Sequence, residues 1–222
     1  VSSAASDVYK RQVSIGGALG PKNQSIFDEC SEAQIESVLK VLADSNISAI
    51  DFDTEGTEFG SQAGGPTANY AKYLAVIKWV KKTYPDIKVS FTFPVYSGYW
   101  ANGWNPNFGN FIKNTDGLID SYRVMVIGVG GSDGFRKYWD LSTKELNKLN
   151  VSPTKTPLYA VIDPWNSSDN SVTPSQALDF LNYIQANQGA GITFNGLGNP
   201  SALIWYNCFR DATAGVCPTT RP

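Results

Sequence analysis

Residues 49–56 read Ala49-Ile-Asp-Phe-Asp-Thr-Glu-Gly56, and this stretch decides how the rest of the chain is interpreted. Successive side chains of a β-strand point to opposite faces, so Asp51, Asp53 and Glu55 share one face and the apolar residues between them share the other. Alternate residues lie about 6.6 Å apart along a strand, which is close enough for neighbouring carboxyl groups to interact. The pattern predicts a strand that is apolar on one face and acidic on the other.

A row of carboxyl groups is typical of an acid–base site. Neighbouring carboxylates raise the pKa of one member of the row, so that this member stays protonated near neutral pH and can protonate a leaving group. Two other interpretations remain open, a solvated acidic edge and a calcium loop. In a calcium loop the acids of residues 51–56 would occupy positions 1, 3 and 5, but the last ligand would be Gln62 instead of Glu, and a strand-like segment precedes Asp51 where that motif has a helix.

Short apolar segments alternate with amphipathic ones along the chain, and Ser31 with Gln34 forms a capping box before one of them. Repeated β-α units predict an α/β fold with a parallel sheet, open or closed into a barrel, in which functional residues follow the strands. The expected strands are residues 13–17, 49–52, 88–93, 122–127, 158–162 and 202–206, and the expected helices are 31–44, 69–83, a short one near 110, one within 134–149, and 174–187.

Composition excludes several functional classes. The chain has no histidine, which excludes Ser-His-Asp and Cys-His nucleophilic sites and the usual zinc sites. Its 18 basic and 20 acidic residues provide no basic field for nucleic acid, and no apolar run is long enough to span a membrane. The three cysteines allow a Cys208–Cys217 disulfide with Cys30 left buried, or no disulfide at all.

The first twelve residues look foreign to the rest of the chain. Ser2 to Gln12 back-translates with permitted codons into a string that resembles a transposase sequencing adaptor read in frame. We therefore expect residues 1–12 to be a non-native tract with few contacts to the fold, and residues 13–222 to form the folded domain.

The acidic strand resembles the DxxDxDxE signature of glycoside hydrolase family 18, the chitinases. Asp51, Asp53 and Glu55 match its last three acids, and Ser48 stands in place of the first. Ser14-Ile-Gly-Gly17 is similar to the family's SxGG motif on its third strand.

Two further segments carry the resemblance. Lys88 to Pro94 is similar to the family's fifth strand, and Trp205 matches the tryptophan that floors its sugar site. The resemblance implies a (β/α)8 TIM-barrel type of fold, here incomplete, with the first two strands missing upstream and Val13 to Ile15 as an exposed edge strand.

The resemblance also implies a function. Glu55 is the general acid and then the general base, Asp53 orients the acetamido group of the substrate, and Asp51 partners Asp53. The substrate is chitin or another N-acetylglucosamine-containing oligosaccharide, and no metal or cofactor takes part. The family places its members outside the cell, and we expect a monomer. The expected substrate-binding residues are Trp205, Tyr96, Trp100 and Gly17.

The chain departs from the family at one place. Family members carry an Asp and a Tyr on the sixth strand, where this chain has Gly128 and Val129. Either another ring, such as Tyr96 or Tyr206, replaces that Tyr, or the protein is a non-catalytic, lectin-like carbohydrate-binding barrel.

Overall fold

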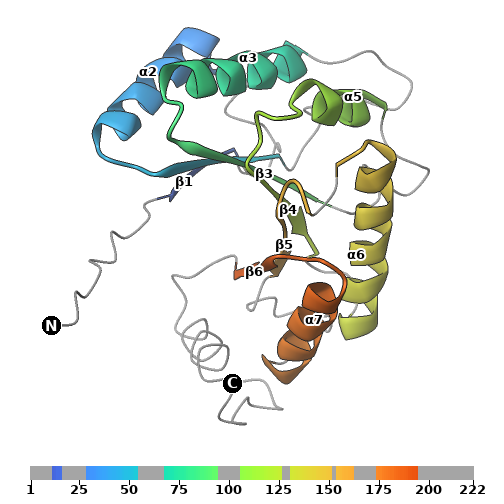
Figure 1. Cartoon of the computed structure of the whole chain (residues 1–222). Coiled ribbons are helices and arrows are strands. Elements are labelled where there is room, and N and C mark those ends of the chain that lie inside the picture. Colours follow the sequence, from blue (N-terminus) through green and yellow to red (C-terminus); the bar gives the residue numbers. More distant parts are fainter. Residues whose placement is uncertain are drawn as a thin grey trace, which may run out of the picture. The chain divides into compact units, whose positions relative to one another are not determined.

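The computed structural model describes residues 12–16, 29–54, 68–94, 106–126, 131–151, 154–162 and 174–194. These residues form an α/β fold in which parallel strands alternate with helices, as in part of a (β/α) barrel (Figure 1). The chain divides into two compact units, the first made of residues 1–93 and 105–120 and the second of residues 94–104 and 121–222. The acidic strand belongs to the first unit.

Three parallel strands form the sheet of the first unit, in chain order. They are β1 (Gln12–Gly16), β2 (Ala49–Asp53) and β3 (Lys88–Pro94), with β2 between the other two. The register places Ser14 of β1 and Ser90 of β3 directly beside Asp51 of β2. Among the described residues β1 pairs with β2 alone, so it is an edge strand there.

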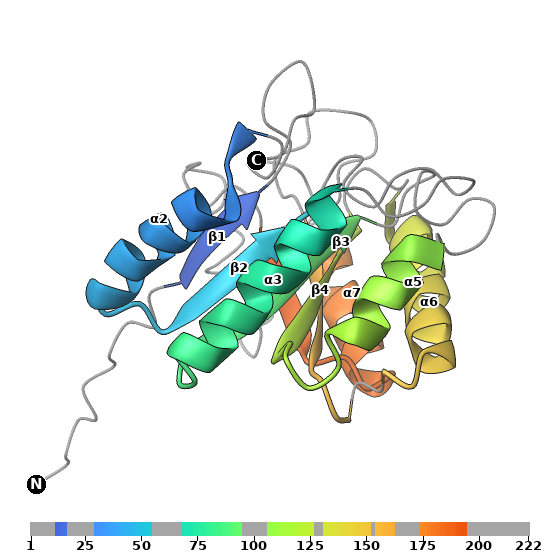
Figure 2. The same ribbon diagram turned by 90° about the horizontal axis from the view of Figure 1, so that it is seen from above.

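Three helices cover one face of this sheet (Figure 1). They are α2 (Glu32–Asp44), α3 (Ala68–Thr83) and α5 (Pro106–Asn114). The predicted capping box begins α2, since the Ser31 hydroxyl accepts from the Gln34 amide at 3.3 Å and the Ser31 amide donates to the Gln34 side chain at 2.8 Å. Figure 2 shows α2 and α3 running alongside the strands they follow or precede, which is the packing expected of β-α units.

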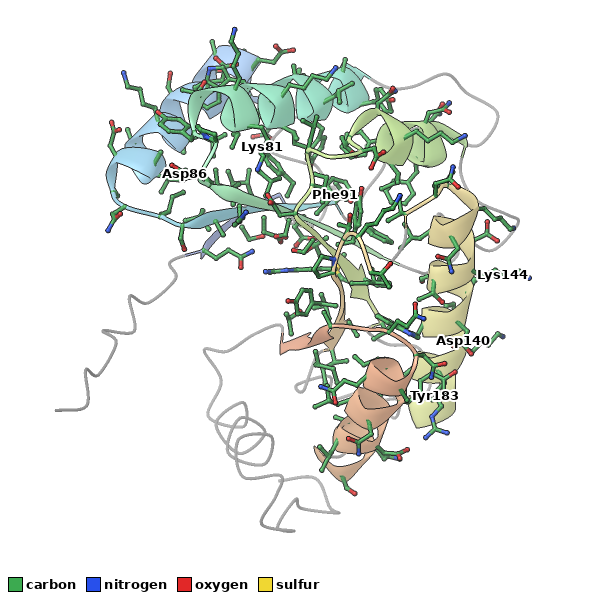
Figure 3. All side chains as sticks on the ribbon, viewed as in Figure 1. Lys81, Asp86, Phe91, Asp140, Lys144 and Tyr183 are labelled. Atoms are coloured by element: carbon green, nitrogen blue, oxygen red, sulfur yellow. The ribbon has the colours of Figure 1, made fainter. Side chains whose placement is uncertain are left out.

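Aromatic side chains fill the space between the sheet and these helices. The rings of Phe52 of β2 and Tyr73 of α3 meet edge to face with their centroids 6.2 Å apart. The ring centroid of Phe91 of β3, labelled in Figure 3, lies 4.9 Å from that of Phe111 of α5. All four side chains are fully buried. Because side chains alternate along a strand, the same packing turns Asp51 and its neighbours to the opposite face of the sheet.

The second unit repeats the architecture. Its strands β4 (Ser121–Met125), β5 (Leu158–Ile162) and β6 (Gly191–Phe194) alternate with helices α6 (Gly131–Lys148) and α7 (Pro174–Ala186). Trp139 of α6 is fully buried, as expected for a core residue, and meets Phe180 of α7 edge to face at 6.4 Å. The Tyr183 hydroxyl donates to the Asp140 carboxylate at 2.7 Å, which raises the pKa of Tyr183 (Figure 3).

Most elements match the expectation from the sequence. The first five predicted strands and all predicted helices appear, the strands with ends shifted by two residues or fewer. The strand β6 was not predicted, and the predicted strand at 202–206 lies outside the described residues. Strand β1 begins at Gln12, the last residue of the tract that the back-translation assigns to the adaptor. The expectation of few contacts is wrong for this residue, since it pairs with Ala49 in the sheet and its side chain donates to Ser90 at 3.1 Å. Residues 1–11 are outside the described part of the chain.

None of the described helices combines the length and the apolar character that crossing a bilayer requires.

Asp120 ties the start of β3 to the chain that follows α5. Its carboxylate accepts from the Val89 amide at 2.8 Å, from Lys81 at 2.9 Å and from Lys88 at 3.2 Å. Burial alone would raise the pKa of Asp120, but the hydrogen bonds from Val89, Lys81 and Lys88 outweigh it and hold that pKa below its ordinary value. The carboxylate therefore stabilises the fold in its ionised form.

Replacing Asp120 by Asn should lower the free energy of unfolding by about 1–3 kcal/mol near neutral pH, because the hydrogen bonds from two lysines lose their charged acceptor. A carboxylate with a lowered pKa contributes stability above its unfolded-state pKa and loses it as the pH falls through the folded-state value. The difference between the parent and Asp120→Asn should therefore shrink below about pH 4. Urea unfolding of the parent and of Asp120→Asn, near neutral pH and again below about pH 4, measures this difference in the free energy of unfolding.

The exposed Asp116, in the turn after α5, supplies the control. Asp116→Asn should leave the unfolding midpoint close to that of the parent at both pH values. Equal stability of Asp120→Asn and the parent near neutral pH would contradict the role given to Asp120.

Candidate functional site

Asp51 is a buried carboxylate surrounded by hydroxyl groups from both neighbouring strands. Only 4% of Asp51 is exposed. Its Oδ2 accepts from the Ser14 hydroxyl of β1 at 3.1 Å, and its Oδ1 accepts from the Ser90 hydroxyl of β3 at 2.5 Å. The Thr92 hydroxyl of β3 lies 2.9 Å from Oδ1 and 2.8 Å from Oδ2. Three strands thus converge on one carboxyl group.

The alternation of β3 explains why these hydroxyls face Asp51. In Lys88-Val-Ser-Phe-Thr-Phe-Pro94 the apolar residues take every second place and are buried against the helices. Ser90 and Thr92 take the places between them and so face the other side of the sheet. Because β2 and β3 are parallel with Asp51 beside Ser90, both hydroxyls reach the same carboxylate.

A carboxylate removed from water needs these partners. Burying an unpaired charge costs several kcal/mol, and each hydrogen bond to a charged group returns about 1.5–3 kcal/mol. Ser90 is itself held by the side-chain amide of Gln12, which donates to its hydroxyl at 3.1 Å. The carboxylate of Asp51 is therefore fixed in position as well as satisfied.

Thr54 holds the chain at the carboxyl end of β2. It follows Asp53, the last residue of that strand, and is fully buried. Both its amide and its hydroxyl donate to the backbone carbonyl of Thr92, each at 3.0 Å. The peptide that leads into Glu55 thus starts from a fixed point on β3.

Gly16 permits the close approach of β1 to the end of β2. It has φ +119°, and a Cβ built on it would lie 1.9 Å from the carbonyl oxygen of its partner Asp53. No side chain fits there. The first glycine of the Ser14-Ile-Gly-Gly17 motif is therefore required by the contact between the two strands.

The structure brings together two of the predicted catalytic acids. Asp51 and Asp53 lie on the same face of β2, the first buried and the second half-buried at the end of the strand. The other predicted site residues lie outside the described residues, namely Glu55, Gly17, Tyr96, Trp100 and Trp205.

Sequence reasoning missed the hydroxyl residues around Asp51. Ser90 and Thr92 alternate with the apolar residues of β3, and a parallel register between that strand and β2 would have turned them toward the acids. No sequence pattern could have indicated the role of Thr54, because its partner is a backbone carbonyl, a group that every residue carries.

The structure removes one requirement of the calcium-loop interpretation, the helix before Asp51, and positions 5 to 12 of that motif lie outside the described residues. Residues 49–53 form the strand β2, not the end of a helix, and both oxygens of Asp51 accept hydrogen bonds from hydroxyls. No cluster of three or more potential metal ligands occurs within the described ranges.

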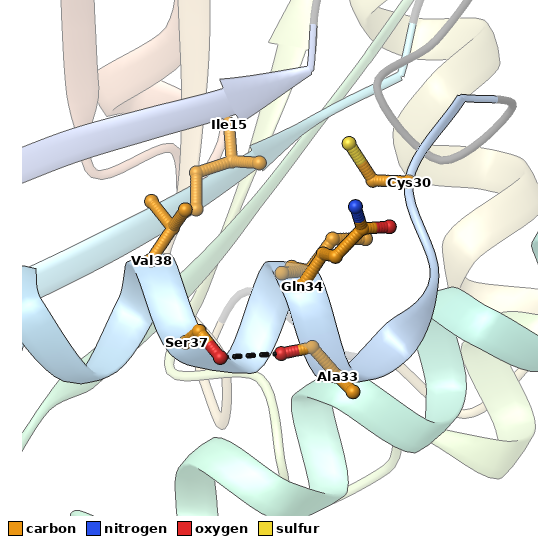
Figure 4. A pocket seen from close by; sticks show the side chains of 7 residues that line it. Ile15, Cys30, Ala33, Gln34, Ser37 and Val38 are labelled. Carbon is orange, nitrogen blue, oxygen red and sulfur yellow. Dashed lines mark hydrogen bonds between the residues drawn. The ribbon is translucent and has the colours of Figure 1, made fainter.

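A hollow of about 550 Å³ lies between β1 and α2 on the helix side of the sheet (Figure 4). Ile15 faces it, whereas Ser14, the preceding residue, faces Asp51. The described residues that line it are mostly apolar, and none of them carries a carboxylate. The carboxyl groups of Asp51 and Asp53 lie on the opposite face of the sheet.

Neither a protein family model nor a curated protein sequence matches the chain. Similar solved structures do exist. A family 18 chitinase from Pseudoalteromonas aurantia is 16% identical with a TM-score of 0.67, over 90% of this chain and 75% of that one. Active domain 2 of the thermostable chitinase from Pyrococcus furiosus, solved with chito-oligosaccharides, is 18% identical with a TM-score of 0.61, over 82% of this chain and 60% of that one.

The C-terminal domain of Legionella pneumophila ChiA is also similar, with 18% identity and a TM-score of 0.57 over 93% of this chain and 81% of that one. The chain thus spans three fifths of the Pyrococcus chitinase domain and larger shares of the other two. At these identities the similarity shows the fold, which is that of family 18 chitinase domains. The resemblance expected from the sequence is confirmed at that level.

Gly16→Ala tests the close contact at the end of β1. The added methyl group would overlap the Asp53 carbonyl and would sit on a backbone that L-residues rarely adopt, so the free energy of unfolding should fall by at least about 2 kcal/mol. Thermal unfolding measures the loss.

Gly117→Ala is the matched control. Gly117 also has a positive φ, of +74°, but nothing lies within 4 Å of an added Cβ. Gly117→Ala should therefore lose only the stability that an alanine costs at a positive φ, with no overlap added to it. A loss as large as that of Gly16→Ala would show that the contact with Asp53 contributes nothing.

Proposed function

We propose that the protein is a glycoside hydrolase that cleaves β-1,4-linked N-acetylglucosamine polymers with retention, through participation of the substrate's own acetamido group. One observation carries the proposal. Asp51 and Asp53 share a face at the carboxyl end of a parallel strand, where Asp51 is buried among hydroxyls and Glu55 takes the next alternate place in the sequence.

In the proposed reaction Glu55 donates its proton to the glycosidic oxygen, and the bond from that oxygen to the anomeric carbon breaks. The acetamido oxygen of the same sugar bonds to the anomeric carbon on the opposite face and forms a cyclic cation. Glu55 then takes a proton from a water molecule. The oxygen of that water attacks the anomeric carbon and breaks its bond to the acetamido oxygen, which restores the acetamido group. Two inversions at that carbon give net retention.

Asp53 and Asp51 have different parts in this scheme. Asp53 is half-buried at the strand end, and we assign it to the acetamido N–H, which it orients and whose positive charge it stabilises. Asp51 is 4% exposed and its oxygens bind hydroxyls of the protein. It therefore acts through Asp53 and does not touch the sugar.

Several further assignments belong to the proposal. Trp205, Tyr96 and Trp100 would contact the sugar, since aromatic rings pack against the apolar faces of pyranose rings. Gly17 is assigned to the sugar site through the resemblance of Ser14-Ile-Gly-Gly17 to the family's SxGG motif. The partner is a chitin oligosaccharide, bound by a monomer, and the reaction needs no cofactor. The location outside the cell, which the family resemblance implies, is also part of the proposal.

A second candidate function is carbohydrate binding without hydrolysis. Gly128 and Val129 stand where the resemblance leads to an Asp and a Tyr, and the Tyr hydroxyl would hold the acetamido carbonyl. Losing one such hydrogen bond to a developing charge costs about 10² to 10³ in rate. The two candidates differ in whether product forms.

We expect the protein to release shorter chito-oligosaccharides from a soluble oligomer, with the β-anomer as the first product. Proton NMR during hydrolysis measures the anomer directly, and calorimetry measures oligosaccharide binding in parallel. Binding with no product after long incubation would reject the hydrolase in favour of the lectin-like candidate. Initial release of the α-anomer would reject participation of the acetamido group.

Glu55→Gln should lower kcat by at least about 10²-fold while leaving the oligosaccharide affinity close to that of the parent, because the amide keeps the shape but has no transferable proton. Glu58→Gln makes the same change at the next glutamate in the sequence and should keep the activity of the parent. If Glu55→Gln retained full turnover, another group would be the acid.

A further inference from the structure

We propose that Thr92 is a positioning residue that holds Asp51 and the peptide before Glu55 in a fixed relation to each other. The inference rests on the proposed function, in which Asp51 supports Asp53 and Glu55 donates the proton. Thr92 contacts neither the substrate nor the reacting atoms in this scheme. It acts through the acids on the neighbouring strand.

The side chain of Thr92 provides the first half of the link. Its hydroxyl lies 2.9 Å from Oδ1 and 2.8 Å from Oδ2 of Asp51, so it meets both oxygens of the carboxylate. Ser14 and Ser90 each meet only one of them. Thr92 is therefore the residue of the three whose hydroxyl is placed to fix the rotation of the carboxylate plane.

The backbone of Thr92 provides the second half. Its carbonyl accepts from the amide and from the hydroxyl of Thr54, each at 3.0 Å. The hydrogen bond from the Thr54 amide continues the ladder between β2 and β3. The Thr54 hydroxyl donates a second hydrogen bond to the same carbonyl oxygen. The chain is therefore doubly anchored at the residue directly before Glu55.

Thr92 is suited to this role because both its backbone and its side chain are held in place by their surroundings. It is 5% exposed and lies between Phe91 and Phe93, both fully buried against the helices. A β-branched side chain has few rotamers, so the position of its hydroxyl follows from the position of its backbone. A shift of β3 would move the Asp51 carboxylate and the start of the Glu55 peptide together.

The consequence is that catalysis should depend on the Thr92 hydroxyl, although Asp51 and Asp53 stand between that hydroxyl and the substrate. Misplacing a catalytic group by about 1 Å can cost about 10²-fold in rate. Thr92→Val keeps the shape and the carbonyl but removes the hydroxyl, and we expect kcat to fall by about that factor with little change in KM. Thr92→Ser keeps the hydroxyl and should restore most of the rate.

Two further variants separate the halves of the link. Thr54→Val removes only the second anchor on the Thr92 carbonyl, and kcat should fall less than in Thr92→Val. Thr115→Val is the matched control, because Thr115 is also fully buried in the first unit but its hydroxyl binds backbone carbonyls of α5. This control should leave kcat unchanged.

Carbon-13 NMR of the aspartate side chains supplies a measurement that needs no activity. Thr92→Val should shift the Asp51 Cγ signal, whereas Thr54→Val and Thr115→Val should leave it in place. If the parent hydrolyses nothing but Thr92→Val shifts this signal, the proposed function fails and the link to Asp51 stands. An unmoved signal in Thr92→Val, or parental kcat in both Thr92→Val and Thr54→Val of an active enzyme, would overturn the inference.

Discussion

The burial of one carboxyl group is the constraint on which the first unit depends. Asp51 lies in the central strand β2, and a carboxylate there is tolerable only if donors on both sides reach it. This requirement fixes which face of β1 carries Ser14 and which face of β3 carries Ser90 and Thr92. The aromatic core on the other face of the sheet follows from the same alternation.

The fold was largely predictable from local patterns, and the site only in part. The acids of β2 and the capping box at Ser31 are visible in single segments of sequence. The strand β6 was missed because it has four residues and begins at a glycine with φ +156°, so that its pairing with β5, not its own pattern, makes it a strand. The hydroxyls of β3 were missed for a related reason, since the register between strands is not local information.

The fold by itself leaves the chemistry open. Structures that share it are only 16–18% identical to this chain, and one barrel architecture supports many reactions. What narrows the choice is the surroundings of two aspartates in a chain without histidine. Carboxyl groups are then the natural proton carriers, and the carboxyl group of Asp51 on β2 is held in place by Ser14, Ser90 and Thr92.

The chemical nature of the groups around Asp51 has an electrostatic consequence. A buried carboxylate is often satisfied by arginine or lysine, which would cancel its charge. Hydroxyls donate hydrogen bonds through dipoles alone, so Ser14, Ser90 and Thr92 stabilise the carboxylate without adding a positive charge of their own. These three contacts therefore orient the carboxyl group of Asp51 and leave the local charge unchanged.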